Sequence, residues 1–323
     1  MNRKFKKALI TGITGSGGSY LAEHLLKKEI RVCGLYRSKG NLNLLKRNYK
    51  NQITFYKNDL CDYHSLKNRL KKINPDVIFH IASDADVRKS FDYPIQNSYN
   101  NNSITINLLE SIRRLAPKIN PLIIICSTSE VYGNVSKKKL PINEKQQIAP
   151  INPYAVTKTF QDLMSQVYHK SFGLKIIITR MFSYTNSRRN NLFQTSFVNQ
   201  IIKIERGQKK FLFHGNLKSR RTFLDIEDAM EAYWLAAIKG KIGEIYNIGG
   251  NDVISIKNYL KKIISLTSAK ILCKLDKNLL RPTDISAQIP DSTKFRRHTG
   301  WKPKVNFQKS IEKLYIECKK KFK

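Results

Sequence analysis

The first half of the chain alternates short apolar runs with segments whose apolar residues recur every three or four positions. The run Ile176-Ile177-Ile178 has no apolar–polar alternation, which is typical of a strand buried on both faces of a parallel sheet. The intervening segments have the helical period. We therefore predict strands at Lys7–Thr11, Arg31–Tyr36, Ile53–Tyr56, Val77–His80, Leu122–Ser127 and Leu174–Arg180, with helices that include Ser19–Lys28, Ser65–Lys72 and Ser103–Leu115.

The second half is less regular. It contains an amphipathic helix that begins after Ser255 and another near the C-terminus. Residues 222–248 again have the pattern of strand, helix and strand, so part of this stretch should rejoin the first sheet. The predicted fold is α/β: a Rossmann-type doubly wound parallel sheet over residues 1–181, regaining part of 222–248, and a smaller C-terminal α/β substrate domain over 182–323.

Composition adds a formal net charge of +35, from 59 Lys and Arg against 24 Asp and Glu. Such an excess can indicate nucleic-acid binding, but the lysines are spread along the chain, which favours a lysine-rich surface that would also attract an anionic substrate. A nucleic-acid-binding protein on this fold is the alternative of another class. Without a long apolar run, an export signal or a CxxC pair, we expect a cytoplasmic protein with no membrane segment and no metal.

A glycine-rich turn follows the first predicted strand. Its spacing, GxxGxxG, allows a tight turn and lets the backbone approach a pyrophosphate, while the next helix offers its N–H groups. No lysine follows the third glycine, which excludes an NTPase phosphate loop. The turn predicts a dinucleotide site that consists of Gly12, Gly15, Ser16, Gly17 and Gly18.

The end of the second strand indicates the type of dinucleotide. An acidic residue there binds the ribose hydroxyls of NAD, whereas an arginine accommodates the extra phosphate of NADP. The strand ends in Tyr36-Arg37-Ser38 without an acid, so we expect NADP, with NAD as the alternative and Arg37 as the phosphate ligand. Asp59 and Leu60, after the third strand, should meet the adenine.

Two segments carry candidate catalytic groups. Tyr154 and Lys158 share one helix face because they lie four residues apart. A cation beside a phenol favours the phenolate, so Tyr154 is a candidate base that takes a hydroxyl proton while hydride leaves the carbon. The opposite face of this helix should be buried, and it consists of Val156, Phe160, Leu163, Met164 and Val167.

Thr128 and Glu130 follow the fifth strand, whose carboxyl end should face the ligand crevice. Thr128 can hydrogen-bond the same substrate oxygen as Tyr154. Simple oxidation and reduction need no carboxylate at this place. Elimination of water next to a carbonyl needs a base and an acid, and one carboxyl group, that of Glu130, can fill both roles.

Several motifs resemble the extended short-chain dehydrogenase/reductase family over nearly the whole chain. TGITGSGGSYLAEHLL at 11–26 and STSEVYG at 127–133, with PYAVTK at 153–158, are particularly similar to GDP-mannose 4,6-dehydratases. In the related dTDP-glucose dehydratases the second of these motifs has Thr-Asp-Glu, and the 4-epimerases lack the glutamate. The resemblance implies catalytic roles for Thr128, Glu130, Tyr154 and Lys158.

The resemblance also implies partners. Positions that bind the nucleotide diphosphate match Arg221 and Arg281, whose planar forks suit phosphate oxygens. Arg188 and Arg189 match a loop that contacts the cofactor of a neighbouring subunit. We therefore expect a homodimer or homotetramer, with Arg188 at the cofactor and a GDP-sugar as the substrate.

One departure from the family concerns the sugar. The family's Phe-Asn-His after the sixth strand is Phe182-Ser183-Tyr184 here, so the smaller Ser183 replaces a substrate-facing amide. GDP-mannose and the larger GDP-manno-heptose are therefore both candidate substrates. The expected reaction oxidises C4, eliminates water across C5–C6 and returns hydride to C6, giving a GDP-4-keto-6-deoxy sugar for surface polysaccharide. A GDP-4-keto-6-deoxy-sugar reductase or 4-epimerase is the nearest alternative.

Overall fold

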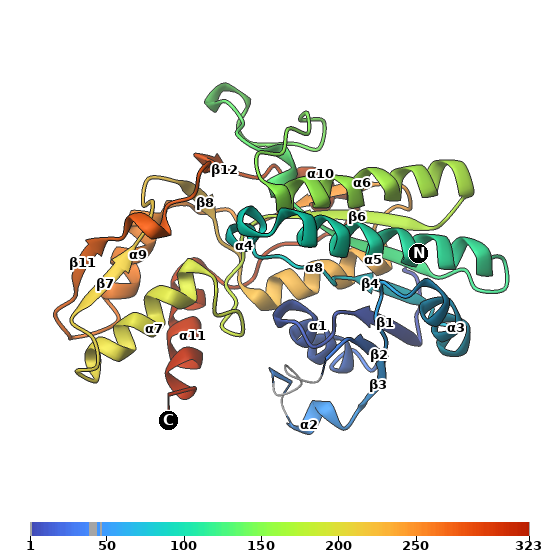
Figure 1. Ribbon diagram of the computed structural model, residues 1–323, viewed down its shortest axis with the longest axis horizontal. Helices are drawn as coiled ribbons and strands as arrows, with labels where there is room; N and C mark the ends of the chain where they lie inside the picture. The colour runs from blue at the N-terminus through green and yellow to red at the C-terminus, as the bar shows by residue number, and fades with distance from the viewer. Residues whose placement is uncertain (1, 39–43, 46, 323) are drawn as a thin grey trace.

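A seven-stranded parallel sheet forms the centre of the larger part of the molecule, in the order β3-β2-β1-β4-β5-β6-β9 (Figure 1). The computed structural model describes residues 2–38, 44, 45 and 47–322. The chain order reverses between β1 and β4, where a crevice opens at the carboxyl ends of the strands. The strands are β1 (Lys7–Thr11), β2 (Arg31–Tyr36), β3 (Ile53–Lys57), β4 (Val77–His80), β5 (Leu122–Thr128), β6 (Ile176–Met181) and β9 (Ile245–Ile248).

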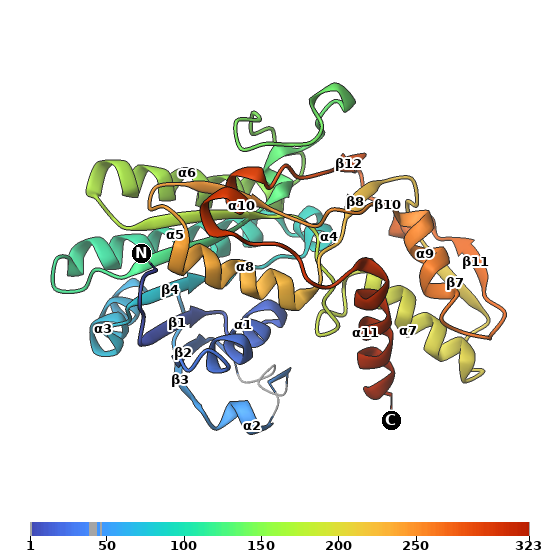
Figure 2. The same ribbon diagram turned by 180° about the vertical axis from the view of Figure 1, so that it is seen from behind.

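Helices cover both faces of this sheet. One apolar layer joins it to α3, α5 and α6, and another joins it to α1, α8 and α10, which Figure 2 shows from behind. Ile124 and Ile125 belong to opposite layers, so β5 has no polar face. The helices are α1 (Ser16–Leu26), α2 (Arg47–Lys50), α3 (Tyr63–Ile73), α4 (Val87–Asp92), α5 (Pro94–Leu115), α6 (Pro153–Phe172), α8 (Ile226–Lys239) and α10 (Thr293–Thr299).

The smaller part packs around an aromatic cluster in which the ring centroids of Phe223 and Tyr259 lie 4.6 Å apart. Phe193 and Phe307 complete the cluster, and Ser255 caps α9 by accepting a hydrogen bond from Asn258 N. The sheets β10-β8-β12 and β11-β7 lie beside it. These elements are β7 (Phe211–His214), β8 (Arg220–Thr222), β10 (Val253–Ser255), β11 (Leu272–Leu275), β12 (Ala287–Gln288), α7 (Phe193–Glu205), α9 (Ile256–Ile264) and α11 (Phe307–Lys320).

The predicted α/β fold is confirmed, and β1, β2 and β4 have the predicted bounds. The prediction for the face that α6 buries is wrong. Val156, Leu163 and Val167 are 52%, 48% and 46% exposed, whereas the polar Gln161 and Asp162 are buried. The period of a helix shows which residues share a face. Here the polar face is the inner one, because its side chains find hydrogen-bond partners inside the protein.

A buried ion pair sets the position of α6. Nε and Nη2 of Arg180, on β6, donate to the two carboxylate oxygens of Asp162 at 2.8 and 3.0 Å. Arg180 Nη1 also donates to the Tyr132 hydroxyl at 2.9 Å, in the 3₁₀ turn η2 (Ser129–Tyr132). Tyr154 lies on α6 and Glu130 on η2, so Arg180 holds the two elements that contain these candidate catalytic residues against the sheet.

Candidate active site

Two adjoining cavities lie at the carboxyl ends of the central strands. The first, of about 490 Å³, covers the glycine-rich turn. The second, of about 550 Å³, lies between the large sheet and the smaller part of the molecule. Residues that line both cavities form a shared border, and they are Ile81, Ser83, Ala85, Asp86, Tyr184, Arg189 and Asn191.

The first cavity has the geometry of a dinucleotide site. Gly12 has φ +69°, and a Cβ on Gly18 would lie 2.4 Å from the Gly12 carbonyl oxygen, so the turn needs these glycines. The N-terminus of α1 opens onto the cavity. The predicted cofactor ligands that line it are Gly12, Gly15, Ser16, Gly17, Gly18, Arg37, Asp59 and Leu60.

Two buried polar atoms of this cavity, Asn58 Oδ1 and Ser83 Oγ, have no hydrogen-bond partner in the described part of the chain. Such atoms are costly unless a ligand or water satisfies them. Arg37 is exposed at the end of β2, where its Nη1 donates to Asn100 Oδ1 at 3.2 Å. The donors, acceptors and bare backbone here fit a nicotinamide dinucleotide.

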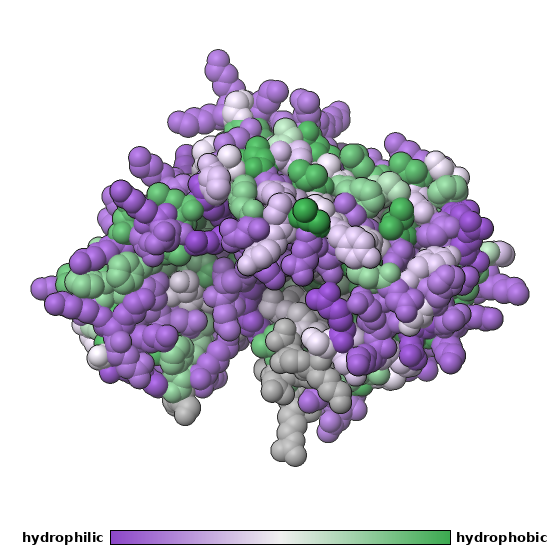
Figure 3. Space-filling model, viewed as in Figure 1, coloured by the Kyte–Doolittle hydropathy of each residue, from purple (hydrophilic) through white to green (hydrophobic). Residues whose placement is uncertain are grey.

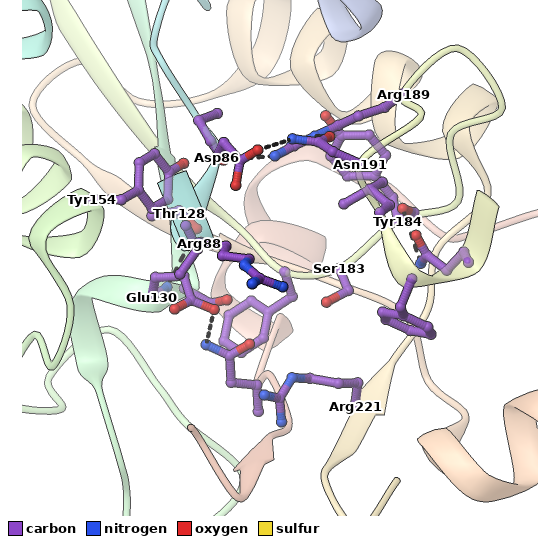
Figure 4. Close-up of a pocket in the computed structure, with 18 of the residues that line it drawn as sticks. Asp86, Arg88, Thr128, Glu130, Tyr154, Ser183, Tyr184, Arg189, Asn191 and Arg221 are labelled. Atoms are coloured by element: carbon purple, nitrogen blue, oxygen red, sulfur yellow. Dashed lines mark hydrogen bonds between the residues drawn. The ribbon is translucent and has the colours of Figure 1, made fainter. Parts of the chain in front are cut away.

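The second cavity brings Thr128, Glu130 and Tyr154 together (Figure 4). Asn152 Nδ2 and Gln288 Nε2 donate to the two oxygens of Glu130 at 3.0 and 3.4 Å. These two amides hold the carboxylate at the cavity wall.

Burial raises the pKa of the Tyr154 phenol, whereas the charge of Arg189 and a hydrogen bond with Thr128 lower it. The charge of Arg189 has the larger of these two lowering effects. Lys158, one turn further along α6, donates from its Nζ to the Cys126 carbonyl at 2.6 Å and to Gln161 Oε1 at 2.5 Å. Burial also lowers the pKa of Lys158 to about 8.

The predicted substrate ligands Ser183, Arg221 and Arg281 all line the second cavity. Arg221 is 8% exposed, and its Nη2 donates to the Ile285 carbonyl at 2.8 Å. Burial lowers the pKa of Arg221, nearby Glu130 and Asp284 oppose that shift, and Arg281 lowers it further. Two neighbouring guanidinium groups thus face one cavity, an arrangement that a bound anion would stabilise.

Arg188, a predicted cofactor ligand, lies outside both cavities of this chain. Its Nη2 donates to both oxygens of Glu23 at 2.8 Å, and its guanidinium stacks 3.8 Å from the centre of the Tyr20 ring. Arg188 therefore fastens the loop to α1 and does not line either cavity. Its neighbour Arg189 lines both, and Arg189 Nη2 donates to the Ala85 carbonyl at 2.6 Å.

Sequence reasoning missed Asp86, Arg88 and Asn191. Asn191 Nδ2 donates to Asp86 Oδ2 at 2.7 Å, which joins the loop after β6 to the segment after β4. Arg88 extends into the second cavity near Glu130, and no hydrogen bond or ion pair holds its guanidinium in the described part of the chain (Figure 4). Asp86 and Arg88 follow β4, so the rule that ligands meet the carboxyl ends of strands could have found them.

The described residues contain no cluster of three or more His, Cys, Asp and Glu side chains that could hold a metal ion. Among the helices described, none is long and apolar enough to cross a membrane.

The sheet order, the glycine turn and the Tyr154–Lys158 pair define an extended short-chain dehydrogenase/reductase fold. Residues 9–314 match the model of the family described as GDP-mannose 4,6 dehydratase, and the chain belongs to that family.

Individual relatives agree with this assignment. The chain is 29% identical over 326 residues to GDP-mannose 4,6 dehydratase 1 of Arabidopsis thaliana, which covers 97% of this chain and 89% of the relative. It is 33% identical over 289 residues to the dTDP-D-glucose 4,6-dehydratase of Dictyostelium discoideum, covering 83% and 64%. A solved UDP-glucuronic acid 4-epimerase from Bacillus cereus, in complex with UDP-glucuronic acid and NAD, superposes with a TM-score of 0.84 at 28% identity, covering 98% of this chain and all of the epimerase.

The two adjacent arginines should have separable effects. Arg188→Met removes the cation from a buried ion pair and should lower the free energy of unfolding by about 3 kcal/mol. Arg189→Met, at the cavity border, should cost less than about 1 kcal/mol. Urea unfolding of the two variants measures both values. Equal losses would contradict the different placement of the two side chains.

Proposed function

We propose that this protein is a nicotinamide-dependent GDP-sugar 4,6-dehydratase. The observation that carries the proposal is the position of Glu130, a carboxylate in the same cavity as Thr128 and Tyr154. A reductase or an epimerase has no need for an acid and base at this place, whereas elimination of water does. Membership of the GDP-mannose 4,6-dehydratase family supports the same reaction.

The proposed catalytic groups are Thr128, Glu130, Tyr154 and Lys158. A nicotinamide cofactor, which the residues of the glycine turn with Arg37, Asp59 and Leu60 would hold, would supply the hydride acceptor at C4 and the hydride donor at C6, so no NADPH would be consumed overall. Tyr154 takes the proton of the C4 hydroxyl, with Thr128 bonded to its oxygen and Arg189 offsetting the charge. Glu130 then takes the proton at C5, which the new carbonyl makes acidic, and donates it to the departing C6 hydroxyl, which leaves as water. When hydride returns to C6, C5 takes up the proton that Tyr154 accepted, so all protons balance.

Arg221 and Arg281 are the proposed diphosphate ligands. Their guanidinium groups face the same cavity and repel each other, which a diphosphate between them would offset. For the sugar, we propose a contact with Ser183, whose hydroxyl points into the cavity, and with the guanidinium of Arg88 (Figure 4). GDP-mannose and GDP-manno-heptose are both candidates, because Ser183 leaves room and Arg88 offers donors for a further hydroxyl.

The proposed division of labour follows the two cavities. Residues 1–181, with α8 and β9 returning from later in the chain, would bind the cofactor, because they surround the glycine turn and complete the large sheet. The rest of residues 182–323 would bind the sugar nucleotide. Of the two cofactors we propose NADP, because Arg37 directly follows β2, where an acidic residue would bind NAD.

A homodimer through α5 and α6 is the proposed assembly. These long helices lie side by side, and large apolar side chains gather on their outer face, visible as hydrophobic patches above the centre and toward the right in Figure 3. A face of about 30 by 20 Å is comparable to the ~800 Å² that each partner buries in a stable interface. The exposed side chains are Ile95 and Tyr99 on α5 and Val156, Leu163 and Val167 on α6, with Tyr93 directly before α5.

The reaction is tested by incubating the protein and NADP with a panel of GDP-hexoses and GDP-heptoses that differ at C2 and C6. One of them should lose the mass of one water, without net NADPH consumption. Glu130→Gln should bind cofactor and substrate but dehydrate ~10²–10⁴-fold more slowly. Mass spectrometry and fluorescence titration measure these quantities. Net NADPH consumption, or full activity of Glu130→Gln, would contradict the proposal.

The cofactor preference should depend on Arg37. Wild-type protein should bind NADP more tightly than NAD by about tenfold or more, because a charge-assisted hydrogen bond to phosphate is worth ~1.5–3 kcal/mol. Arg37→Asp should reverse the order, since a carboxylate repels the phosphate and accepts from ribose hydroxyls. Calorimetric titration measures the four dissociation constants. Arg297→Asp, an exposed residue on α10 outside both cavities, is the control for net charge.

The assembly is tested by light scattering after size-exclusion chromatography. Wild-type protein should have the mass of a dimer or a multiple of it. Leu163→Lys should produce monomers at micromolar concentration, because it buries a charge in the proposed interface. Ile316→Lys, at an apolar side chain that is 53% exposed on α11, is the matched control and should leave the mass unchanged. A monomeric wild type would exclude this interface.

A further inference from the structure

Lys158 is an ammonium group in an almost closed environment. The residue is 3% exposed, and it is among those that line the second cavity. An ammonium has three N–H donors. Two of them are used by the Cys126 carbonyl and Gln161 Oε1, and Gln161 is the one side chain that accepts from Nζ in the described part of the chain.

Gln161 is itself held by a chain of buried side chains. Its Nε2 donates to Thr105 Oγ1 at 3.2 Å, and Thr105 donates its own proton to the Asn101 carbonyl at 2.9 Å. The remaining contact of Thr105 Oγ1, at 3.4 Å from His80 Nε2, must therefore be donated by His80. His80 Nδ1 then accepts from the Thr11 hydroxyl at 2.9 Å.

This order gives the glutamine amide one orientation. Burial lowers the pKa of His80 to about 3, so the imidazole is neutral and has a single proton to donate. Since Thr105 Oγ1 accepts from Gln161, the amide nitrogen must face Thr105 and the amide oxygen must face Lys158. This series of hydrogen-bonded side chains thus directs an acceptor, Gln161 Oε1, toward Lys158 Nζ and no competing donor.

Other ionisable groups near Lys158 do not replace this acceptor. The charge of Asp162 raises the pKa of Lys158, but this carboxylate is hydrogen-bonded to Arg180, Ser127 and Gln166 and does not accept from Nζ. The Cys126 thiol and His80 are buried and neutral, because burial raises the pKa of Cys126 to about 12. Tyr154, on the same helix face, is the group that the ammonium should assist.

We propose that Gln161 is a positioning residue for Lys158, which keeps the buried ammonium protonated and directs its third N–H to the side of the cavity where the cofactor and Tyr154 meet. The proposal rests on the proposed function, because it assigns that ammonium a part in the reaction. It predicts that the charge at position 161 controls the protonation of Lys158.

The test compares Gln161→Met, which removes the acceptor, with Gln161→Glu, which adds a negative charge in the same shape. Competitive labelling with acetic anhydride between pH 6 and 11, read by mass spectrometry, measures the titration midpoint of Lys158. The midpoint should fall by about one pH unit in Gln161→Met and rise by about one or more in Gln161→Glu. Gln200→Met is the control, because Gln200 Oε1 also accepts from a lysine, Lys209, at 2.9 Å, but in the smaller part of the molecule.

The alkaline limb of the pH profile of kcat/KM should move with the midpoint of Lys158, to lower pH in Gln161→Met and to higher pH in Gln161→Glu. Unchanged midpoints in folded variants, or shifts in the same direction, would overturn the proposal. If Gln161→Met does not fold, the midpoint of Gln161→Glu alone decides, supporting the proposal if it rises and overturning it if not. The titration midpoints of the two variants could shift in opposite directions even if the wild-type protein dehydrates no GDP-sugar. That result would support the role of Gln161 and reject the dehydratase function.

Discussion

The buried ion pair between Asp162 and Arg180 is the constraint on which the arrangement of the site depends. Both side chains are almost fully inaccessible, at 0% and 3% exposed, and such a pair is tolerated only when its hydrogen bonds are satisfied. Ser127 and Gln166 donate further hydrogen bonds to the carboxylate of Asp162. The Tyr132 hydroxyl accepts from the Arg180 guanidinium and donates to Asn247 of β9. The pair therefore joins β5, η2, α6, β6 and β9 at the edge where the ligands are proposed to bind.

That polar interior explains the unusual orientation of α6. The helix directs Lys158, Gln161 and Asp162 inward, where each has partners, and leaves Val156 and Leu163 exposed. A monomer gains nothing from exposed apolar side chains, whereas a second copy could bury them. The same choice of face thus accounts for the positioning of the proposed catalytic lysine and for the apolar surface through which we propose dimerisation.

Positive charge is concentrated at the second cavity as well as on the surface. Most of the positive residues lie at the surface. The described residues that line the second cavity nevertheless include four arginines, Arg88, Arg189, Arg221 and Arg281. Glu130 lies among them and is held by neutral amides. A dianionic substrate would find complementary charge, and the carboxylate would stay available for proton transfer. The segment after β4 and the loop after β6 meet over this cavity through Asp86 and Asn191.

The sequence by itself determined the elements whose signal is local. Uninterrupted apolar runs located β1, β2 and β4, because strands buried on both faces leave no polar position. The glycine spacing located the turn before α1. The carboxyl end of the predicted fifth strand placed Thr128 and Glu130 at the crevice, where the structure also puts them, Thr128 at the end of β5 and Glu130 just after it. Their catalytic roles are proposals that the E130Q variant tests.

Only the tertiary structure decided which of several equivalent side chains faces which partner. Arg188 and Arg189 are identical and adjacent, but Glu23 on the distant α1 binds the first and leaves the second to line the cavities. The period of α6 defined two faces. The polar one faces inward because Asp162 and Gln161 have hydrogen-bond partners in the interior. Local sequence cannot contain this information, because the free energy of burying a polar group depends on partners contributed by other segments of the chain.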